Sequence, residues 1–486
     1  MNQAIRSSWL VAVALFALVF GSITYIQFFA ADDLKNNDLN SRGLIEQFCS
    51  DRGAILVGGQ PIAESVPSPD KCKFQRVYHQ SELYAGLTGF FSRAYGQYGI
   101  EKAENAQLTG ETADAFYDKV LSLLSGAQPK GRSVELTIDP AIQQMAYNMI
   151  PDGQRGSIVV MNPKTGAIIA MVSKPSYDTN VLAGHDATSV AKNYNRLLGI
   201  DGIDMFGSSA YTKLYSPGSV FKLVDTAAAL ASGKYNKDSV LANPQELSFP
   251  GTDATLPNYV NGGCGAKTQA GFSFVLEQSC NTPFAEIALD LGQDAITEQA
   301  RKFGFNDDSL YFPDKVTASK FPGSKGQLGT AELARSAVGQ QDVQATPLEI
   351  AMMTAAIANG GAQMKPNLVK SIRTPDLKPV EEFTPEVLRQ STTPEIAHQI
   401  TDWMTNVVDK GIAHAATVPG VEVAGKTGTA EGIPGVVNNN AWFTGFAPAQ
   451  DPQVVVSIVM SNVDIATGAQ LTSPNASKLI EAVLNK

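Results

Sequence analysis

A long apolar stretch near the N-terminus constrains this chain more than any other feature of its sequence. Across residues 9–31 the only ionisable side chain is that of Tyr25. These 23 residues are enough to cross the roughly 30 Å hydrocarbon core of a bilayer as a helix. Arg6 precedes the stretch and Asp32 and Asp33 follow it, so the positive-inside tendency predicts a cytoplasmic N-terminus and an exported remainder. A cleaved signal peptide is the alternative, but the stretch is too long for one and lacks an Ala-x-Ala site, so we expect one uncleaved anchor.

The rest of the chain has the composition of an ordered protein with two or three domains. Of its 486 residues, 44% are hydrophobic and 17% are charged. The net charge of -10 argues against nucleic-acid binding, because phosphate binding needs a basic surface.

Four cysteines lie on the predicted exported side, where disulfides can form. Proximity in sequence favours Cys49 with Cys72 and Cys264 with Cys280, although the sequence equally allows free buried thiols. No metal site is expected, because neither Cys-x-x-Cys nor His-x-x-x-His spacing occurs. The four histidines are His79, His185, His398 and His414.

The order of strand-like and helix-like segments predicts one large α+β domain after a smaller N-terminal part. The segments 158–161 and 167–172 flank a turn sequence and predict a hairpin. Helical patterns fill the middle of the chain, and strand patterns return near the C-terminus. This order predicts a sheet to which both the early and the late strands contribute. The expected helices lie at 220–232 and 283–291, and the late strands at 421–430, 441–446 and 454–460. In the N-terminal part we expect strands at 52–59 and 134–139, then a helix capped by Asp139 with Pro140 at its first position.

Three short motifs predict chemistry, and the first is Ser219-x-x-Lys222. The same spacing recurs at 68–71 and 189–192, so it is weak evidence alone. Its context separates it, because a Ser-Pro-Gly sequence precedes an apolar helix and supplies a cap and a helix-starting proline. Ser219 and Lys222 then lie on one face at the start of that helix. Burial lowers the pKa of such a lysine, which can accept the serine proton, while the helix N-terminus favours an anionic intermediate.

The second motif is Ser279-Cys280-Asn281, in a loop before a predicted helix. Its pattern recurs at 473–475, and a loop asparagine often makes only turn hydrogen bonds. The functional interpretation has Ser279 relay a proton and Asn281 hold a substrate amide.

The third motif is Lys426-Thr427-Gly428-Thr429 on a predicted strand, where Gly428 leaves room for a ligand backbone. The copy at 164–166 is interpreted as structural, because its glycine can supply the positive φ of a hairpin turn. A strand lysine is common by itself. The order of the three motifs along the chain is more informative. The first supplies a hydroxyl nucleophile and an amine, the second a further hydroxyl and an amide, and the third a cation on a strand. Together they predict an acyl-transfer site.

With these motifs the chain resembles the class B penicillin-binding proteins, the monofunctional membrane-anchored transpeptidases of bacterial peptidoglycan, over almost its whole length. It is most similar to the penicillin-binding protein A type of actinobacteria. Supporting similarities lie at 52–55, 99–101, 136–139, 339–340, 346–348 and 442–446. The resemblance implies an α+β fold of the penicillin-binding and serine β-lactamase type, with an antiparallel sheet flanked by helices plus an all-helical part. It also implies a cytoplasmic tip and anchor at 1–31, a pedestal resembling a dimerisation domain at 32–154, and a transpeptidase domain at 155–486.

The resemblance also implies the catalytic roles. Ser219 would attack the D-Ala-D-Ala amide of a stem peptide and release the terminal D-alanine, and Lys222 would take its proton. Ser279 would pass a proton to the leaving amine, and the backbone amides of Ser219 and Thr429 would form the oxyanion hole. An amine of a neighbouring stem would then attack the acyl-enzyme and form the cross-link.

Substrate binding would fall to the second and third motifs. Asn281 would hold the acyl side chain, and Lys426 with Thr427 would receive the substrate carboxylate. If Cys280 pairs with Cys264, the redox state could fix the loop that carries Ser279, which we state as a hypothesis.

The expected partners are stem peptides, lipid-linked or nascent glycan strands, β-lactams that imitate D-Ala-D-Ala, and a polytopic glycan polymerase with division proteins. No cofactor is expected. A D,D-carboxypeptidase or a serine β-lactamase shares the motifs and differs in using water as the acceptor. A β-lactam receptor or a silent division scaffold is the non-enzymatic alternative, which the short cytoplasmic tip and the presence of Ser219 and Lys222 disfavour.

Overall fold

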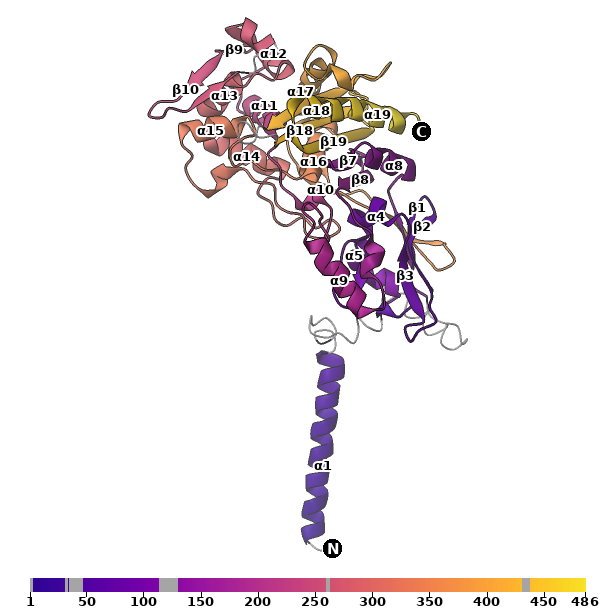
Figure 1. Ribbon diagram of the computed structural model, residues 1–486. Coiled ribbons are helices and arrows are strands. Elements are labelled where there is room, and N and C mark those ends of the chain that lie inside the picture. The colour runs from indigo at the N-terminus through magenta and orange to yellow at the C-terminus, as the bar shows by residue number, and fades with distance from the viewer. Residues whose placement is uncertain (1–2, 31–33, 35–46, 113–129, 259–262, 431–437) are drawn as a thin grey trace.

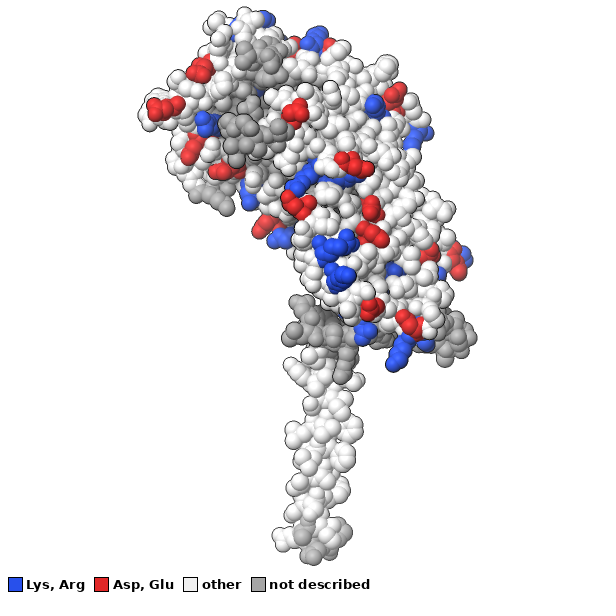
Figure 2. Space-filling model, in the orientation of Figure 1, with Lys and Arg blue, Asp and Glu red and all other residues white. Residues whose placement is uncertain are grey.

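An apolar helix at the N-terminus stands apart from the folded body of the chain (Figure 1). The computed structural model describes residues 3–30, 34, 47–112, 130–258, 263–430 and 438–486. Helix α1, Gln3–Thr24, continues into a π-helical turn, η1, Tyr25–Phe29. The span Ile5–Phe29 is long and apolar enough to cross a membrane. Figure 2 shows its visible surface almost free of the charged side chains that are scattered over the body. The helix fits the predicted anchor, whereas residues 31–33 lie outside the described part.

The pedestal next to this helix is built on a six-stranded sheet. Its strand order is β15-β14-β6-β1-β2-β3, and β1 lies parallel to β6. The strands are β1 Ile55–Val57, β2 Gln60–Pro67, β3 Phe74–Tyr78, β6 Ser133–Leu136, β14 Val369–Arg373 and β15 Pro379–Glu382. The early strands at 52–59 and 134–139 are confirmed in shorter form. Two strands from beyond residue 368 complete the same sheet, so the pedestal is assembled from distant parts of the chain.

Smaller elements surround the pedestal sheet. They are α4 Ser81–Thr88, β4 Phe91–Ser92, β5 Gly96–Gln97, α5 Ile100–Ala103, α6 Asn105–Thr109, η2 Thr179–Leu182 and α9 Ala187–Leu198. Helix α8, Pro140–Asn148, leads toward the second part, and the Asp139 carboxylate accepts hydrogen bonds from the amides of Ala141 and Ile142. The predicted cap and the proline at the helix start are therefore confirmed.

A buried charge cluster holds the pedestal together. The Glu101 carboxylate lies 2.8 Å from Arg52 Nη2 and 2.6 Å from Arg76 Nε, and all three side chains are almost fully buried. Burial by itself would raise the pKa of Glu101, but Arg76 and Arg52 hold that pKa below its ordinary value. One carboxylate thus compensates two guanidinium ions that solvent cannot reach.

The catalytic part contains a five-stranded antiparallel sheet in the order β17-β18-β19-β7-β8. Its strands are β7 Arg155–Met161, β8 Ile168–Lys174, β17 Ala424–Ala430, β18 Asn439–Ala447 and β19 Val454–Val463. The predicted early hairpin and the three late strands are confirmed. Strand β19 pairs with β7, which joins the two ends of the chain. Helices α16 Pro347–Ala358, α18 Ile465–Leu471 and α19 Ser473–Leu484 pack on this sheet.

A mainly helical part, which lies in sequence between β8 and β17, packs beside the five-stranded sheet at the end of the molecule away from the anchor (Figure 1). Its main helices are α11 Lys222–Ala231, α12 Phe272–Glu277, α13 Thr282–Leu291, α14 Gln293–Phe303, α15 Thr330–Ala337 and α17 Pro394–Asp409. Short elements connect them: α10 Ser209–Thr212, η3 Gly218–Val220, β9 Val240–Ala242, β10 Glu246–Ser248, β11 Thr255–Pro257, η4 Gly263–Ala266, β12 Gln269–Gly271, η5 Pro322–Lys325, β13 Ala362–Met364, β16 Val387–Gln390 and η6 His414–Ala416. The helices predicted at 220–232 and 283–291 are confirmed as α11 and α13.

We expect Glu101→Gln to destabilise the pedestal by about 3–5 kcal/mol, because it leaves two buried guanidinium ions without a counter-charge. The measurement is thermal or denaturant unfolding of the full chain. Glu64→Gln is the matched control, since Glu64 pairs with the half-exposed His79 and should change stability by less than about 1 kcal/mol. Equal losses in the two variants would show that the cluster is not what holds the pedestal.

Candidate active site

The first and third motifs are held together by close backbone contact. Gly218 has a φ of +55°, and a Cβ there would lie 2.5 Å from the Thr429 carbonyl oxygen. A Cβ on Gly428 would lie 2.5 Å from the Pro217 carbonyl oxygen. Glycine is needed at both positions, because any side chain would separate the strand that carries Lys426 from the turn that carries Ser219.

The helix that begins at Ser219 starts differently from the prediction. A 3₁₀ turn, η3, precedes α11, and no side-chain cap closes it. The cap expected from the Ser-Pro-Gly sequence is therefore wrong. The Ser216 carbonyl instead accepts a hydrogen bond from Trp442 Nε1 at 3.0 Å. This contact with β18 anchors the turn through a carbonyl oxygen, whereas the Gly218 amide, a donor of the kind that a cap would satisfy, bonds to the Gly339 carbonyl oxygen at 2.9 Å.

Lys222 is fully buried and donates to the second motif. Its Nζ lies 2.8 Å from the Ser279 carbonyl oxygen, 2.7 Å from Asn281 Oδ1 and 3.4 Å from Ser279 Oγ. Among the described residues, no hydrogen bond joins Ser219 to Lys222, because these acceptors occupy the amine. The two side chains thus start one helix, as predicted, but their direct contact is absent in the ligand-free arrangement.

The Ser279 hydroxyl joins the second motif to the third. Lys426 Nζ donates to Ser279 Oγ at 2.8 Å and to the Thr427 carbonyl oxygen at 3.0 Å. Ser279 has a φ of +58°, which directs its hydroxyl between the two lysines. Residues 147 positions apart therefore meet at one oxygen atom.

Both lysine amines titrate far below their ordinary range. Burial lowers the pKa of Lys222 well below its usual value, and the nearby Lys426 lowers it further. Burial also lowers the pKa of Lys426, to about 7. The lowered pKa of Lys222 favours its free amine, which is the form that a general base requires.

Asp225 belongs to this buried group and was missed by sequence reasoning. It lies one helical turn after Lys222 and is completely buried, and neither carboxyl oxygen has a hydrogen-bond partner among the described atoms. Burial raises its pKa well above the ordinary range, and Lys222 opposes this only partly. An acidic residue inside an apolar helix was the available signal.

A cavity of about 220 Å³ opens over the three motifs. Lys222 and Lys426 are buried behind its wall, whereas the other predicted site residues line it. The lining residues are Ser219, Ser279, Asn281, Val338, Gln340, Ile412, Ala415, Thr427, Gly428, Thr429, Ala441, Trp442, Ile465, Ala469, Thr472 and Ser473. The structure thus brings all eight predicted site residues to one place. The decoy copies at 68–71, 164–166 and 189–192 contribute nothing to it.

Comparison with known proteins identifies the family. A family model described as the penicillin binding protein transpeptidase domain matches residues 156–481. The chain belongs to this family. A second model, the penicillin binding protein A dimerisation domain, matches residues 52–134. The expected fold and the class B resemblance are confirmed.

Two relatives are similar over their full lengths. The chain is 36% identical to peptidoglycan D,D-transpeptidase PbpA of Mycolicibacterium smegmatis, with 100% of both chains covered. It is also 36% identical to PbpA of Mycobacterium tuberculosis strain H37Rv, covering 100% of this chain and 99% of that protein. A solved structure of M. tuberculosis penicillin-binding protein A, an imipenem acyl-enzyme complex, superposes with a TM-score of 0.84 at 35% identity. That match covers 90% of this chain and 100% of the other.

In this penicillin-binding protein, a disulfide adjoins the second motif. Cys280 is bonded to Cys264, and Cys49 is bonded to Cys72, so the pairings favoured by proximity are present. The Asn281 amide also donates to Asn258 Oδ1 at 2.7 Å. The loop that holds Ser279 is thus tied on both sides to the segment before α12.

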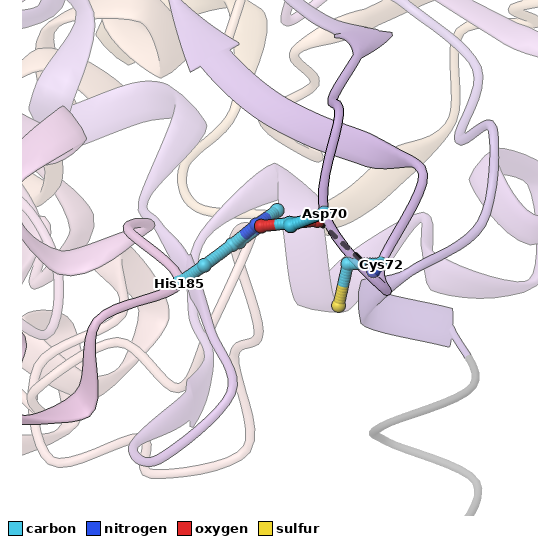
Figure 3. A group of neighbouring side chains, drawn as sticks. All are labelled: Asp70, Cys72 and His185. Carbon is cyan, nitrogen blue, oxygen red and sulfur yellow. Dashed lines mark hydrogen bonds and ion pairs between the residues drawn. The ribbon is translucent and has the colours of Figure 1, made fainter.

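Three side chains of types that can bind metals lie close together in the pedestal, but they do not form a metal centre. Figure 3 shows Asp70, Cys72 and His185, with the imidazole directed at the Asp70 carboxylate. That carboxylate pairs with His185 Nδ1. The sulfur of Cys72 is already bonded to Cys49, so it cannot act as a thiolate ligand. The group is explained as a histidine–aspartate hydrogen bond beside a disulfide.

We expect the second-order rate of penicillin acylation to fall as pH rises through about 7. The pKa of Lys426 is lowered to about 7, so this amine loses its proton there and no longer attracts the penicillin carboxylate. The measurement is a stopped-flow pH profile with a fluorescent penicillin. In Lys426→Arg the alkaline decline should move upward, because guanidinium stays protonated, and in the decoy Lys164→Arg it should stay in place. A decline that is identical in all three proteins would contradict this assignment.

Proposed function

We propose that the chain is a peptidoglycan D,D-transpeptidase, which cross-links stem peptides through an acyl-enzyme on Ser219, and that β-lactams acylate the same serine. The observation that carries the proposal is the Ser279 hydroxyl, 2.8 Å from Lys426 Nζ and 3.4 Å from Lys222 Nζ, in a cavity that Ser219 lines. The full-length similarity to proteins named D,D-transpeptidase supports it.

In the acylation step Lys222 is the base. When a substrate displaces the resting contacts, its neutral amine takes the Ser219 proton and the serine oxygen attacks the carbonyl of the penultimate D-alanine. The backbone amides of Ser219 and Thr429 stabilise the oxyanion. Ser279 passes a proton from the lysines to the leaving amine, and D-alanine departs. An amine of a second stem then takes the acyl group and restores Ser219.

Substrate orientation falls to residues around this centre. Lys426 and Thr427 bind the terminal carboxylate, since a cation beside a hydroxyl suits that group. Asn281 holds the acyl amide, and Gly428 lets the stem backbone approach the strand that carries Lys426. A D,D-carboxypeptidase would use the same residues with water as the acceptor.

The proposal extends to the domains, the membrane topology and the partners of the chain. In this proposal the cytoplasmic tip and anchor are residues 1–31, the pedestal is residues 32–154, and the transpeptidase domain is residues 155–486, of which β14 and β15 extend into the pedestal sheet. The anchor crosses the membrane once, with the N-terminus in the cytoplasm and the catalytic part outside, in support of which Arg6 precedes the apolar span and acidic residues follow it. Lipid-linked or nascent glycan strands, a polytopic glycan polymerase and division proteins are the proposed partners.

Labelling by a fluorescent penicillin should be abolished in Ser219→Ala, because no nucleophile remains to form the ester bond. Ser189→Ala is the matched control, since Ser189 opens a second Ser-x-x-Lys sequence on exposed helix α9 and should label like the wild type. The readout is fluorescence on a denaturing gel. Labelling of Ser219→Ala at the wild-type level would refute the assignment of the nucleophile.

The acceptor can be identified with a D-Ala-D-Ala stem analogue. With a peptide amine present, a transpeptidase should form the cross-linked product in preference to the hydrolysed one, as measured by mass spectrometry over time. Release of D-alanine with hydrolysed product alone would favour a carboxypeptidase. Rapid turnover of penicillin itself would instead favour a β-lactamase.

A further inference from the structure

The catalytic cavity extends beyond the three motifs to the start of helix α19. There its wall is formed by Ile465, Ala469, Thr472 and Ser473. Ser473 opens the sequence Ser473-Pro474-Asn475, the second Ser-x-Asn copy in the chain. This copy therefore faces the same cavity as the Ser279 motif, and no step of the proposed mechanism uses it.

The first turn of α19 is left without a side-chain cap. Thr472 occupies the N-cap position, but its hydroxyl donates to the Gly468 carbonyl oxygen at 2.9 Å. The Asn475 side chain also turns back and donates to the Leu471 carbonyl oxygen at 2.9 Å. The positive end of this 12-residue helix is thus directed toward the cavity without a local acceptor.

Ser473 supplies a second polar group at this end of the cavity. The residue is only 5% exposed and lines the cavity. Its oxygen is not among the described buried atoms that lack a partner, so the hydroxyl opens onto the cavity, where a bound molecule can accept its hydrogen bond. A free donor at the positive end of a helix suits an anionic acceptor that enters from the cavity.

The charges around this end of the cavity are compatible with an anion. No acidic side chain is found among the described lining residues. The nearest acidic residue along the chain is Asp464, whose carboxylate is engaged by the Thr467 amide at 2.9 Å and by its hydroxyl at 2.7 Å. Helix α19 carries no charged side chain before Lys478.

We propose that the Ser473 hydroxyl and the backbone amides of Ser473 and Asn475 form a subsite for a carboxylate of a stem peptide, distinct from the terminal carboxylate assigned to Lys426 and Thr427. Pro474, between them, has no N–H to contribute. This rests on the proposed function, because it takes the occupant of the cavity to be a stem peptide. A carboxylate of the acyl-donor stem and one of the acceptor stem have the same chemistry, and the experiment separates them.

The test uses the full-length protein in detergent and two D-Ala-D-Ala peptides. They differ only in one upstream side chain, which ends in a carboxylate in one and in a carboxamide in the other. The wild type should prefer the carboxylate by about tenfold in kcat/KM, the usual effect of one charge-assisted hydrogen bond. Ser473→Ala should lose most of this preference, and Ser473→Asp should reverse it by repulsion. Ser477→Ala, on the same helix but bonded to the Thr417 carbonyl outside the cavity, should keep it.

The same matched pair is then offered as acceptor amines to an acyl-enzyme made from one fixed donor. A preference in this arm, seen as the ratio of aminolysis to hydrolysis, assigns the subsite to the acceptor stem. If the wild type shows no preference for the carboxylate peptide either as donor or as acceptor, the proposal is overturned, whatever the variants do. A preference that survives in a folded Ser473→Ala, as judged by thermal unfolding, overturns it as well. Wild-type protein that fails to label with a fluorescent penicillin would instead refute the proposed function.

Discussion

Two lysine amines share one site from which solvent is excluded, and the rest of the catalytic part is arranged around that constraint. Lys222 and Lys426 are both completely buried, which lowers the pKa of each, and the charge of Lys426 lowers the pKa of Lys222 further. The loop at 279–281 makes the pair possible, because its carbonyl, amide and hydroxyl oxygens accept from both amines. The disulfide of Cys280 and the bond from the Asn281 amide to Asn258 fix that loop. These oxygens thus accept from both amines in a site where burial holds the pKa of each lysine below its ordinary value.

The fold supports this site by joining segments that are distant in sequence. Strand β17 carries Lys426 at the edge of the five-stranded sheet, and α11 brings Ser219 and Lys222 from the helical part. Glycines at 218 and 428 allow the two backbones to touch. The pedestal is connected to the same framework, because β14 and β15 leave the catalytic part and complete the pedestal sheet. A change in either part therefore has a continuous packed route to the other.

Much of the site could be predicted because local context is informative. The helix start at Ser219, the loop at Ser279 and the strand at Lys426 are local patterns, and each lies where its pattern indicates. What could not be predicted depends on contacts over long separations. The turn before α11 is held by Trp442 rather than by a local cap. The Lys222 amine bonds to the second motif rather than to Ser219. Asp225 and Ser473 became significant only once their surroundings were known.

By itself, the sequence determined the apolar span, the strand and helix order and the three motifs, because periodicity, turn residues and hydrophobic length act over a few neighbouring residues. The tertiary structure decided which copies of the motifs meet. Serine-lysine and lysine-threonine-glycine patterns recur along the chain, but only those at Ser219 and Lys426 enter the cavity. It also decided that a repeated pattern at 473–475 faces the same cavity. The physical reason is that burial and pKa shifts come from packing between distant segments, which no local pattern encodes.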